Sequence, residues 1–354
     1  MEFDLSKLVR ENIKGLLPYS SARGEFGGDA EIFLDANENA FGSPLSADYS
    51  RYPDPLQTLI KGKLANAVGV SAANIFVGNG SDEAIDLLIR IFCRPGIDNI
   101  LICPPTYGMY EVSANINDIK VKRADLCLDY ELDLESIGNT IDEATKLIFL
   151  CSPNNPTGNS LKRNSILKIA ELFCGIVIVD EAYVHFSERE SLIPEIKTHP
   201  NIVVLQTFSK AWGLAGLRVG KAFANAPVID LMNRVKPPYN VSHIAQKMIL
   251  EAFENRSVVE ARIAEIVKMR GELAGSLAEL SFVDTVYPSE ANFLLVKMTN
   301  PNKIYDLLLI ENIVVRNRST ITLCEGCLRI TIGTPDENAT LIKALRKYEK
   351  GFVH

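Results

Sequence analysis

Short apolar runs alternate with helical patterns across the middle of the chain, from about residue 75 to residue 225. These runs are apolar on both faces, which is typical of strands buried in a parallel sheet. The predicted strands are Asn74–Val77, Asn99–Cys103, Lys120–Arg123, Lys146–Cys151, Ile176–Asp180, Ile202–Gln206 and Val219–Ala224.

Helical periodicity fills the intervals between these strands. In the first interval the apolar residues follow i, i+3, i+4, i+7 spacing from Ile85 to Phe92, and Pro95-Gly96 ends the helix. Residues 160–174 predict a second helix, which stops at Gly175. Such alternation of strands and helices indicates an α/β domain with a mostly parallel sheet of seven strands.

The pattern changes after Pro237-Pro238. A long helical stretch covers roughly residues 242–280, and the elements after it form an α+β unit. They are a strand at Ala291–Lys297, a helix near 301–311, strands at Ile313–Arg316 and Cys327–Ile332, and a closing helix at 336–349. We therefore expect an N-terminal arm (1–35), a large domain (36–240) and a small C-terminal domain (241–354).

Composition narrows the class of protein. The 354 residues are 47% hydrophobic and 23% charged, as in an ordinary globular protein. The formal charge of −7 argues against non-specific binding to nucleic acid. No apolar run approaches the roughly eighteen residues of a membrane span, and the N-terminus lacks the pattern of a signal peptide. We expect a cytoplasmic protein.

Seven cysteines are an odd number for a disulfide framework, and most lie in apolar runs. They are predicted to be small reduced core residues. Cys324 and Cys327 form a C-x-x-C, but no second pair of the kind a zinc site needs is present. A structural turn and a redox or metal role both remain open for this pair, and no metal is predicted.

The stretch from Thr207 to Gly220 carries the strongest chemical signal. It places Lys210 just past an apolar run, flanks it with the hydroxyls of Thr207 and Ser209, and adds Arg218 among glycines. A lysine in such a site is suited to forming a Schiff base with a carbonyl. An arginine and hydroxyls are suited to holding a phosphate dianion. Both needs coincide in pyridoxal 5′-phosphate.

Other strand ends offer groups that fit the same ligand, because ligands of α/β sheets bind at the carboxyl ends of the strands. Residues 77–84, Val-Gly-Asn-Gly-Ser-Asp-Glu-Ala, lead into a helix N-terminus, where backbone N–H groups cradle a phosphate or where Ser81 and Asp82 simply cap the helix. Asp180 ends a buried strand and needs a partner, either a structural cation or a protonated pyridine nitrogen.

Two further loops supply polar and aromatic groups. Prolines on either side of Asn155 stiffen a loop that presents its amide, which suits a phenolate oxygen or an ordinary turn. Tyr107 follows another strand and either stacks on a planar ring or packs in the core. Each signal is open on its own, but all of them fit one ligand.

These residues resemble a known family. Asn155-Pro-Thr-Gly158, Asp180-Glu-Ala-Tyr183 and residues 209–220 are similar to the fold-type-I pyridoxal-phosphate aminotransferases of classes I and II. The resemblance is closer to the histidinol-phosphate aminotransferase family. The segments that show this closer resemblance are residues 18–23, 34–39, 51–55, 78–83, 315–318 and 328–334. The chain departs from the pattern at Ala40, where a proline is usual, and we expect a softer loop there.

The resemblance implies a role for each site residue. Lys210 is expected to bind the cofactor as a Schiff base and to move the substrate proton, Asp180 to pair with the ring nitrogen, and Tyr107 to stack on the ring. Asn155 and Tyr183 are expected to contact the phenolic oxygen. The residues expected around the cofactor phosphate are Gly80, Ser81, Asp82, Thr207, Ser209, Arg218 and Tyr52, the last from the neighbouring subunit of a homodimer. The expected substrate residues are Tyr19, Asn37, Arg316 and Arg329.

The reaction that the resemblance implies is amine exchange between L-histidinol phosphate and 2-oxoglutarate in histidine biosynthesis. Two relatives with the same kind of site stay open: a phosphothreonine-type decarboxylase and an aromatic aminotransferase. A nicotinamide-dependent oxidoreductase is disfavoured, because Glu83 stands where the third glycine of a dinucleotide fingerprint belongs. A cofactor-binding module without activity is also disfavoured, since both the lysine and the acid are present.

Overall fold

A seven-stranded sheet forms the centre of the larger part of the molecule. The computed structural model describes residues 3–17, 19 and 32–351. The strand order is β1-β7-β6-β5-β4-β2-β3, and only β7 runs antiparallel to its neighbours. The strands are β1 (Ile75–Asn79), β2 (Asn99–Ile102), β3 (Lys120–Arg123), β4 (Thr145–Cys151), β5 (Ile176–Asp180), β6 (Ile202–Thr207) and β7 (Val219–Phe223). The predicted α/β class with a mostly parallel sheet is confirmed.

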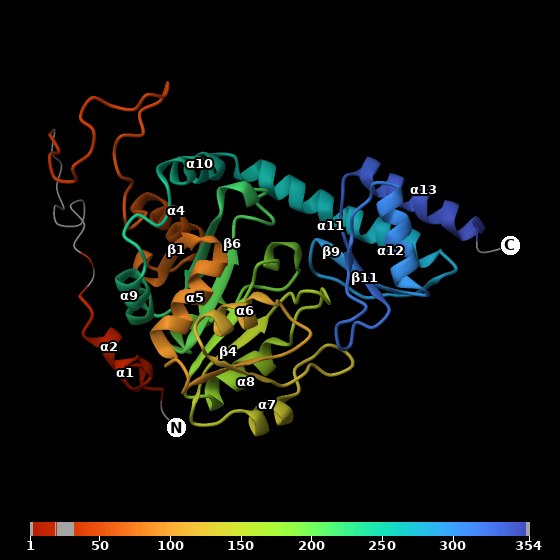
Figure 1. The fold of residues 1–354 in the computed structure, drawn as a ribbon, viewed down its shortest axis with the longest axis horizontal. Helices are drawn as coiled ribbons and strands as arrows, with labels where there is room; N and C mark the ends of the chain where they lie inside the picture. The colour runs from red at the N-terminus through yellow and green to blue at the C-terminus, as the bar shows by residue number, and fades with distance from the viewer. Residues whose placement is uncertain (1–2, 18, 20–31, 352–354) are drawn as a thin grey trace.

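Helices cover both faces of this sheet (Figure 1). Side chains alternate along each strand, so Val177 and Val179 of β5 pack in one core while Ile176 and Ile178 pack in the other. The first core lies against α4 (Thr58–Val68), α7 (Leu134–Thr140), α8 (Arg163–Leu172) and α10 (His243–Glu254). The second lies against α5 (Gly80–Phe92), α6 (Met109–Ile116) and α9 (Ala226–Val235).

The C-terminal part has its own sheet and core. Its strand order is β10-β11-β9-β8, all antiparallel. The elements are α11 (Arg256–Ala278), β8 (Val283–Val286), β9 (Phe293–Met298), α12 (Pro301–Ile310), β10 (Arg316–Asn317), β11 (Cys327–Thr331) and α13 (Pro335–Gly351). Leu277, Val296 and Leu328 are among its fully buried residues. Figure 1 shows this unit beside the large sheet, with α11 leading into it.

The C-terminal elements differ from those predicted from the sequence in three places. The stretch predicted as one helix over 242–280 is two helices, because Asn255 leaves helical geometry between α10 and α11. Strand β8 was not predicted, since Asp284 and Thr285 interrupt its apolar pattern and are exposed. Strand β10 is shorter and later than the predicted Ile313–Arg316.

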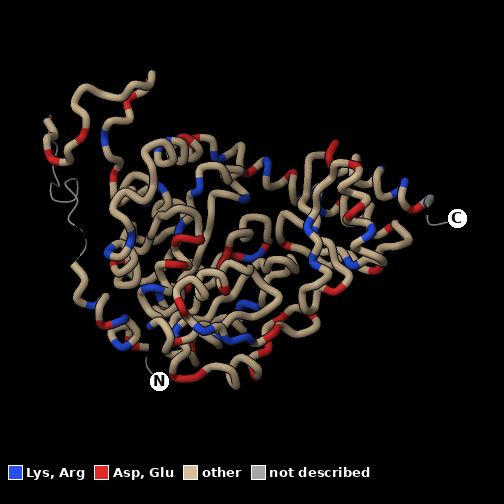
Figure 2. Tube along the Cα trace, viewed as in Figure 1, with Lys and Arg blue, Asp and Glu red and all other residues tan. Residues whose placement is uncertain are grey.

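The remaining elements are short. They are α1 (Leu5–Leu8), α2 (Glu11–Lys14) and the 3₁₀ turns η1 (Ala72–Asn74), η2 (Val184–Phe186), η3 (Ile193–Lys197) and η4 (Ala215–Leu217). Basic and acidic residues are interspersed along the described part of the trace (Figure 2). Within the described residues, no helix combines the length and the apolarity needed to cross a membrane. All seven cysteines are free, and Cys324 and Cys327 are buried.

Candidate active site

A cavity of about 120 Å³ lies at the carboxyl ends of β4, β5 and β6, beside the N-terminus of α5. It brings together eleven of the residues predicted to contact a cofactor. They are Gly80, Ser81, Asp82, Tyr107, Asn155, Asp180, Tyr183, Thr207, Ser209, Lys210 and Arg218. Cys151 and Ala182 complete the lining. Residues from five separate loops therefore face one space.

One end of the cavity is suited to an anion. Gly80 begins α5 with a φ of +72°, and a Cβ there would lie 2.9 Å from Nη2 of Arg218. Gly220 is packed against the same turn, since a Cβ on it would lie 2.3 Å from the Ser81 nitrogen. Arg218 Nη2 also pairs with Asp82 at 3.2 Å. Backbone N–H groups, a hydroxyl and a guanidinium thus converge where only glycines leave room, which fits a phosphate.

The other end of the cavity holds a buried acid. Asp180 is 2% exposed at the end of β5. Tyr110 donates its hydroxyl to Oδ2 at 2.7 Å, and the Ala182 amide donates to Oδ1 at 3.1 Å. Burial raises the pKa of Asp180 to about 6, and the hydrogen bond from Tyr110 opposes that rise. No basic side chain among the described residues forms an ion pair with it within 4.0 Å. A cationic ring nitrogen would complete this group.

Lys210 lies between these two ends. Its ammonium is 5.7 Å from the centre of the Tyr183 ring. Burial is the first cause that lowers the pKa of Lys210, and the positive charge of Arg329 is the second. A lowered pKa makes more of the neutral amine available, which is the form that attacks a carbonyl.

The side walls supply an amide and two phenols. Asn155 accepts a hydrogen bond at Oδ1 from Arg329 Nη1 at 2.5 Å, which leaves its NH₂ group available to a ligand. Tyr107 donates to Asp82 at 3.2 Å and meets Tyr110 edge-on at 5.5 Å. Burial raises the pKa values of both Tyr107 and Tyr183, so both phenols stay protonated. These residues match the donor set that a planar, phosphorylated pyridine with a phenolic oxygen requires.

Arginines of the small sheet gather at the entrance. Arg329 on β11 lies directly across from Arg316 on β10. Its guanidinium is 5.1 Å from the centre of the Phe293 ring, and its Nε has no hydrogen-bond partner among the described residues. Arg318 is half-buried, and its pKa is lowered first by burial and then by the charges of Arg329 and Arg316. Three like charges held this close favour an anionic ligand.

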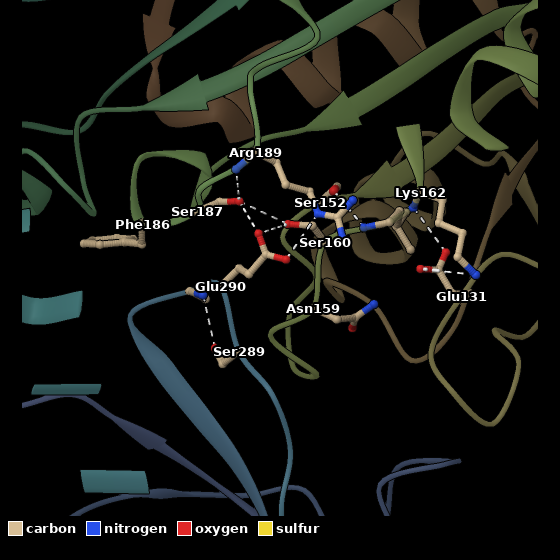
Figure 3. A network of polar contacts seen from close by, with 12 residues as sticks. Glu131, Ser152, Asn159, Ser160, Lys162, Phe186, Ser187, Arg189, Ser289 and Glu290 are labelled. Carbon is tan, nitrogen blue, oxygen red and sulfur yellow. Dashed lines mark hydrogen bonds and ion pairs between the residues drawn. The ribbon is translucent and has the colours of Figure 1, made fainter. Parts of the chain in front are cut away.

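A polar network joins the small sheet to the loop that carries Asn155 (Figure 3). The Glu290 carboxylate accepts hydrogen bonds from Ser187 and, at 3.0 Å, from Ser160. It also pairs with Arg189 at 3.3 Å. The Glu290 amide donates to the carbonyl of Gly158 at 2.7 Å. The network thus ties the segment before β9 to the loop after Asn155.

Three predicted residues lie away from the cavity of this chain. Tyr52 is 50% exposed and stacks on Tyr239 at 4.4 Å, Tyr19 is 76% exposed, and Asn37 is exposed with a φ of +54°. Within the predicted N-terminal motif 18–23, residues 18 and 20–23 lie outside the described residues.

The sequence reasoning missed two residues of the site. Tyr110 holds Asp180, and its signal was available, because it stands three residues after Tyr107 at a helix start. Arg318 was also missed. It alternates with Arg316 along an extended stretch, which puts both side chains on one face.

The chain is similar to known proteins in both sequence and fold. Residues 36–345 match the family model described as aminotransferase class I and II. A histidinol-phosphate aminotransferase of Parabacteroides distasonis is 51% identical over 97% of this chain and 98% of its own length. The crystal structure of the Clostridium acetobutylicum histidinol-phosphate aminotransferase has a TM-score of 0.79 at 25% identity, over 86% of this chain and 92% of its own. That of the Sinorhizobium meliloti enzyme, in complex with pyridoxal 5′-phosphate, has a TM-score of 0.79 at 24% identity, over 90% of each chain.

Proposed function

Because the chain belongs to the class I and II aminotransferase family, we propose that it exchanges an amino group between L-histidinol phosphate and 2-oxoglutarate, with pyridoxal 5′-phosphate as cofactor. The products are imidazole-acetol phosphate and glutamate, and the reverse direction is a step of histidine biosynthesis. The observation that carries the proposal is the single cavity in which Lys210, Asp180, Asn155 and Arg218 meet.

The residues present fit the cofactor group by group. Its phosphate fits the turn at Gly80 and Ser81 with Arg218, its ring nitrogen fits Asp180, and its phenolic oxygen fits Asn155 and Tyr183. When bound, the cofactor supplies an aldehyde that condenses with amines and a ring that accepts electrons from the substrate Cα.

The chain's own residues move the proton, hold the charge at the ring nitrogen and orient the substrate. Lys210 takes the proton from the substrate Cα and returns it on the other side of the exchange, because its lowered pKa suits a general base. Asp180 keeps the ring nitrogen protonated through its charge, which Tyr110 holds in place. Arg329, Arg316 and Arg318 orient the anionic end of each substrate, a carboxylate or a phosphate.

We also propose a homodimer with shared active sites. Large apolar residues between positions 34 and 59 are exposed in one chain, beyond what an isolated subunit needs. They include Leu34 (86%), Phe41 (100%), Leu45 (64%) and Leu59 (70%). Tyr52 lies within this segment, and in the proposed dimer its hydroxyl reaches the phosphate end of the partner's cavity. The seven free cysteines suit a reducing compartment such as the cytoplasm.

An amine-exchange assay tests the proposed substrate. The purified protein with pyridoxal 5′-phosphate is given glutamate and, in separate reactions, imidazole-acetol phosphate, its unphosphorylated analogue or phenylpyruvate. We expect kcat/KM for the phosphorylated acceptor to exceed that for the unphosphorylated one by at least about 100-fold, because unpaired arginines are left when the phosphate is missing. A preference for phenylpyruvate, or release of carbon dioxide from phosphothreonine in place of amine exchange, would contradict the proposal.

A further inference from the structure

A second cavity, of about 510 Å³, lies on the opposite face of the large sheet from the active site. The alternation of side chains sets this separation. Asp180 and Thr207 face the active-site cavity, whereas Gln206 and Lys221 line the second one. Helix α4, the segment around η2, the end of helix α10 and helix α11 form its walls.

Lys221 on the floor of this cavity is a buried cation. It is 3% exposed, at the centre of β7, directly across from Gln206 on β6. Its ammonium lies 4.7 Å from the centre of the Phe208 ring and 5.9 Å from that of Phe223. Among the described residues no carboxylate lies within 4.0 Å of it, and no hydrogen bond to its Nζ is present. A buried charge without a hydrogen-bonded counter-ion is costly, so the ammonium favours an anionic neighbour.

The nearest buried acid is already satisfied by other donors. The Glu181 carboxylate accepts hydrogen bonds from the Leu192 amide at 2.7 Å, from Ser191 Oγ at 2.5 Å and from Gln206 Nε2 at 3.0 Å. Its charge raises the pKa of Lys221, yet burial is the larger cause and lowers that pKa to about 8. Lys221 therefore remains mostly protonated at neutral pH.

Two more polar groups line the same cavity. The Nδ1 atom of His185 and the Nε1–H of Trp212 are both buried and have no hydrogen-bond partner in the part of the chain that the structure describes. Burial, followed by the charges of Lys221 and Arg256, lowers the pKa of His185 to about 3, so its ring is neutral.

The upper walls and the mouth differ from the floor. Leu64 is buried, Val68, Phe253 and Ile263 are partly buried, and all four line the cavity. At the mouth Arg256 is paired with Glu260 at 2.8 Å, and both side chains are exposed. An occupant would thus meet the charge of Lys221 at the floor and apolar surface above it.

From this geometry we propose that the second cavity is a ligand site for a small amphipathic monocarboxylate. The carboxylate pairs with the Lys221 ammonium, and an aromatic or branched aliphatic body packs between Leu64, Val68 and Phe253. The site is separate from the catalytic cavity and does not depend on the proposed reaction.

The test uses the only tryptophan of the chain, Trp212, as its reporter. The holoenzyme is titrated with 3-phenylpropionate while tryptophan emission is recorded, and with the neutral 3-phenylpropanamide as a matched control. We expect a saturable change with the acid and affinity for the amide at least about tenfold weaker, because the amide has no charge for Lys221. The Lys221→Met variant is also expected to bind the acid at least about tenfold more weakly than wild type.

A second variant keeps the test informative if the Lys221→Met protein does not fold. Ala67 is exposed on α4 and lines the cavity, so Ala67→Phe fills the space without touching a buried charge. It is expected to abolish the titration while amine exchange continues. No saturable change in the wild-type protein, or equal affinities for wild type and Ala67→Phe, would overturn the proposal. Loss of binding in Arg329→Gln together with retention in Lys221→Met would overturn it too, since the acid would then lie in the catalytic cleft.

Discussion

At the scale of single residues, Lys210 is the group on which we expect turnover to depend. Lys210→Ala leaves the phosphate turn and Asp180 in place, so we expect it to retain cofactor but to lose at least about 100-fold in kcat. Borohydride should fix the cofactor to the wild-type protein and not to the variant. The exposed Lys197→Ala serves as control. Near-normal turnover in Lys210→Ala would contradict the assignment.

Asp180 is expected to make the stability of the cofactor-free protein depend on pH. Burial raises its pKa from 3.8 to about 6 in the folded state. As pH rises from 4 to 7, the unfolded chain releases this proton before the folded protein does, so the folded state loses stability. Relative to wild type, Asp180→Asn should therefore gain up to about 3 kcal/mol over that interval.

Chemical unfolding of the cofactor-free proteins at several pH values measures this difference. Asp142→Asn is a suitable control, because hydrogen bonds from Lys122 and then Asn99 lower the pKa of that exposed acid. Its titration falls below pH 4, so the variant should follow wild type between pH 4 and 7. A pH-independent difference between wild type and Asp180→Asn would show that the acid is not buried as described.

At the scale of elements, the turn into α5 depends on β7. A Cβ on Gly220 would lie 2.2 Å from the backbone carbon of Gly80. Gly220→Ala should therefore push away the turn at Gly80 and Ser81. We expect this shift to cost about 1–3 kcal/mol of stability and to weaken cofactor binding. Gly216→Ala is the matched control, since a Cβ there meets nothing within 4 Å. Equal cofactor dissociation constants for the two variants, measured by equilibrium dialysis, would refute this role of Gly220.

The large sheet could be predicted because its strands are buried on both faces. Lys120–Arg123 and Ile176–Asp180 were predicted with the bounds that the structure has, and the polar residues just past the strand ends were identified as one site. Helix 160–174 was too long, because α8 begins at Arg163 and ends at Leu172. At the edges of the small sheet, strand β8 was not predicted and β10 was predicted with the wrong bounds, since a half-exposed strand leaves only a weak apolar pattern.

Contacts between distant elements could not be predicted. Nothing in the pattern of residues places Tyr110 against Asp180, or Arg329 against Asn155, since each pair is far apart in the chain. The second cavity is a clearer case. Taken one at a time, Leu64, His185, Lys221 and Phe253 carry no signal, and they share a space only because α4, η2 and α10 pack around β7 on the same face of the sheet. The domain boundaries at residues 35 and 240 stay predictions.

At the scale of the whole molecule, Glu290 couples the two sheets. Glu290→Gln keeps the shape of the side chain but removes the negative charge that accepts a hydrogen bond from Ser160 and pairs with Arg189. We expect the free energy of unfolding to fall by about 1–2 kcal/mol and the KM for the phosphorylated substrate to rise. Glu279→Gln, in the exposed pair with Arg346, should change stability by less than about 1 kcal/mol. Equal effects of the two substitutions in urea unfolding would contradict the coupling.

The proposed dimer predicts complementation between inactive subunits. Lys210→Ala and Tyr52→Ala damage the same composite site from different chains. Hybrids formed by mixing the two variants should contain one doubly altered site and one intact site. Activity should then rise above that of either parent, towards about a quarter of wild type if half of the dimers are hybrids. Size-exclusion chromatography checks the dimer, and mixing without any gain would show that Tyr52 does not act across subunits.

The antiparallel strand β7 also decides when the site can form during synthesis. Strand β1 is at the end of the sheet, and β7 is its only neighbour there among the described residues. Residues 80–218 must leave the ribosome after β1 before that neighbour exists. Until then β1 presents an unpaired edge and the turn at Gly80 lacks the wall that Gly220 provides. A nascent chain therefore cannot use the cofactor as an early nucleus, and the cofactor stabilises only a large sheet that is already closed.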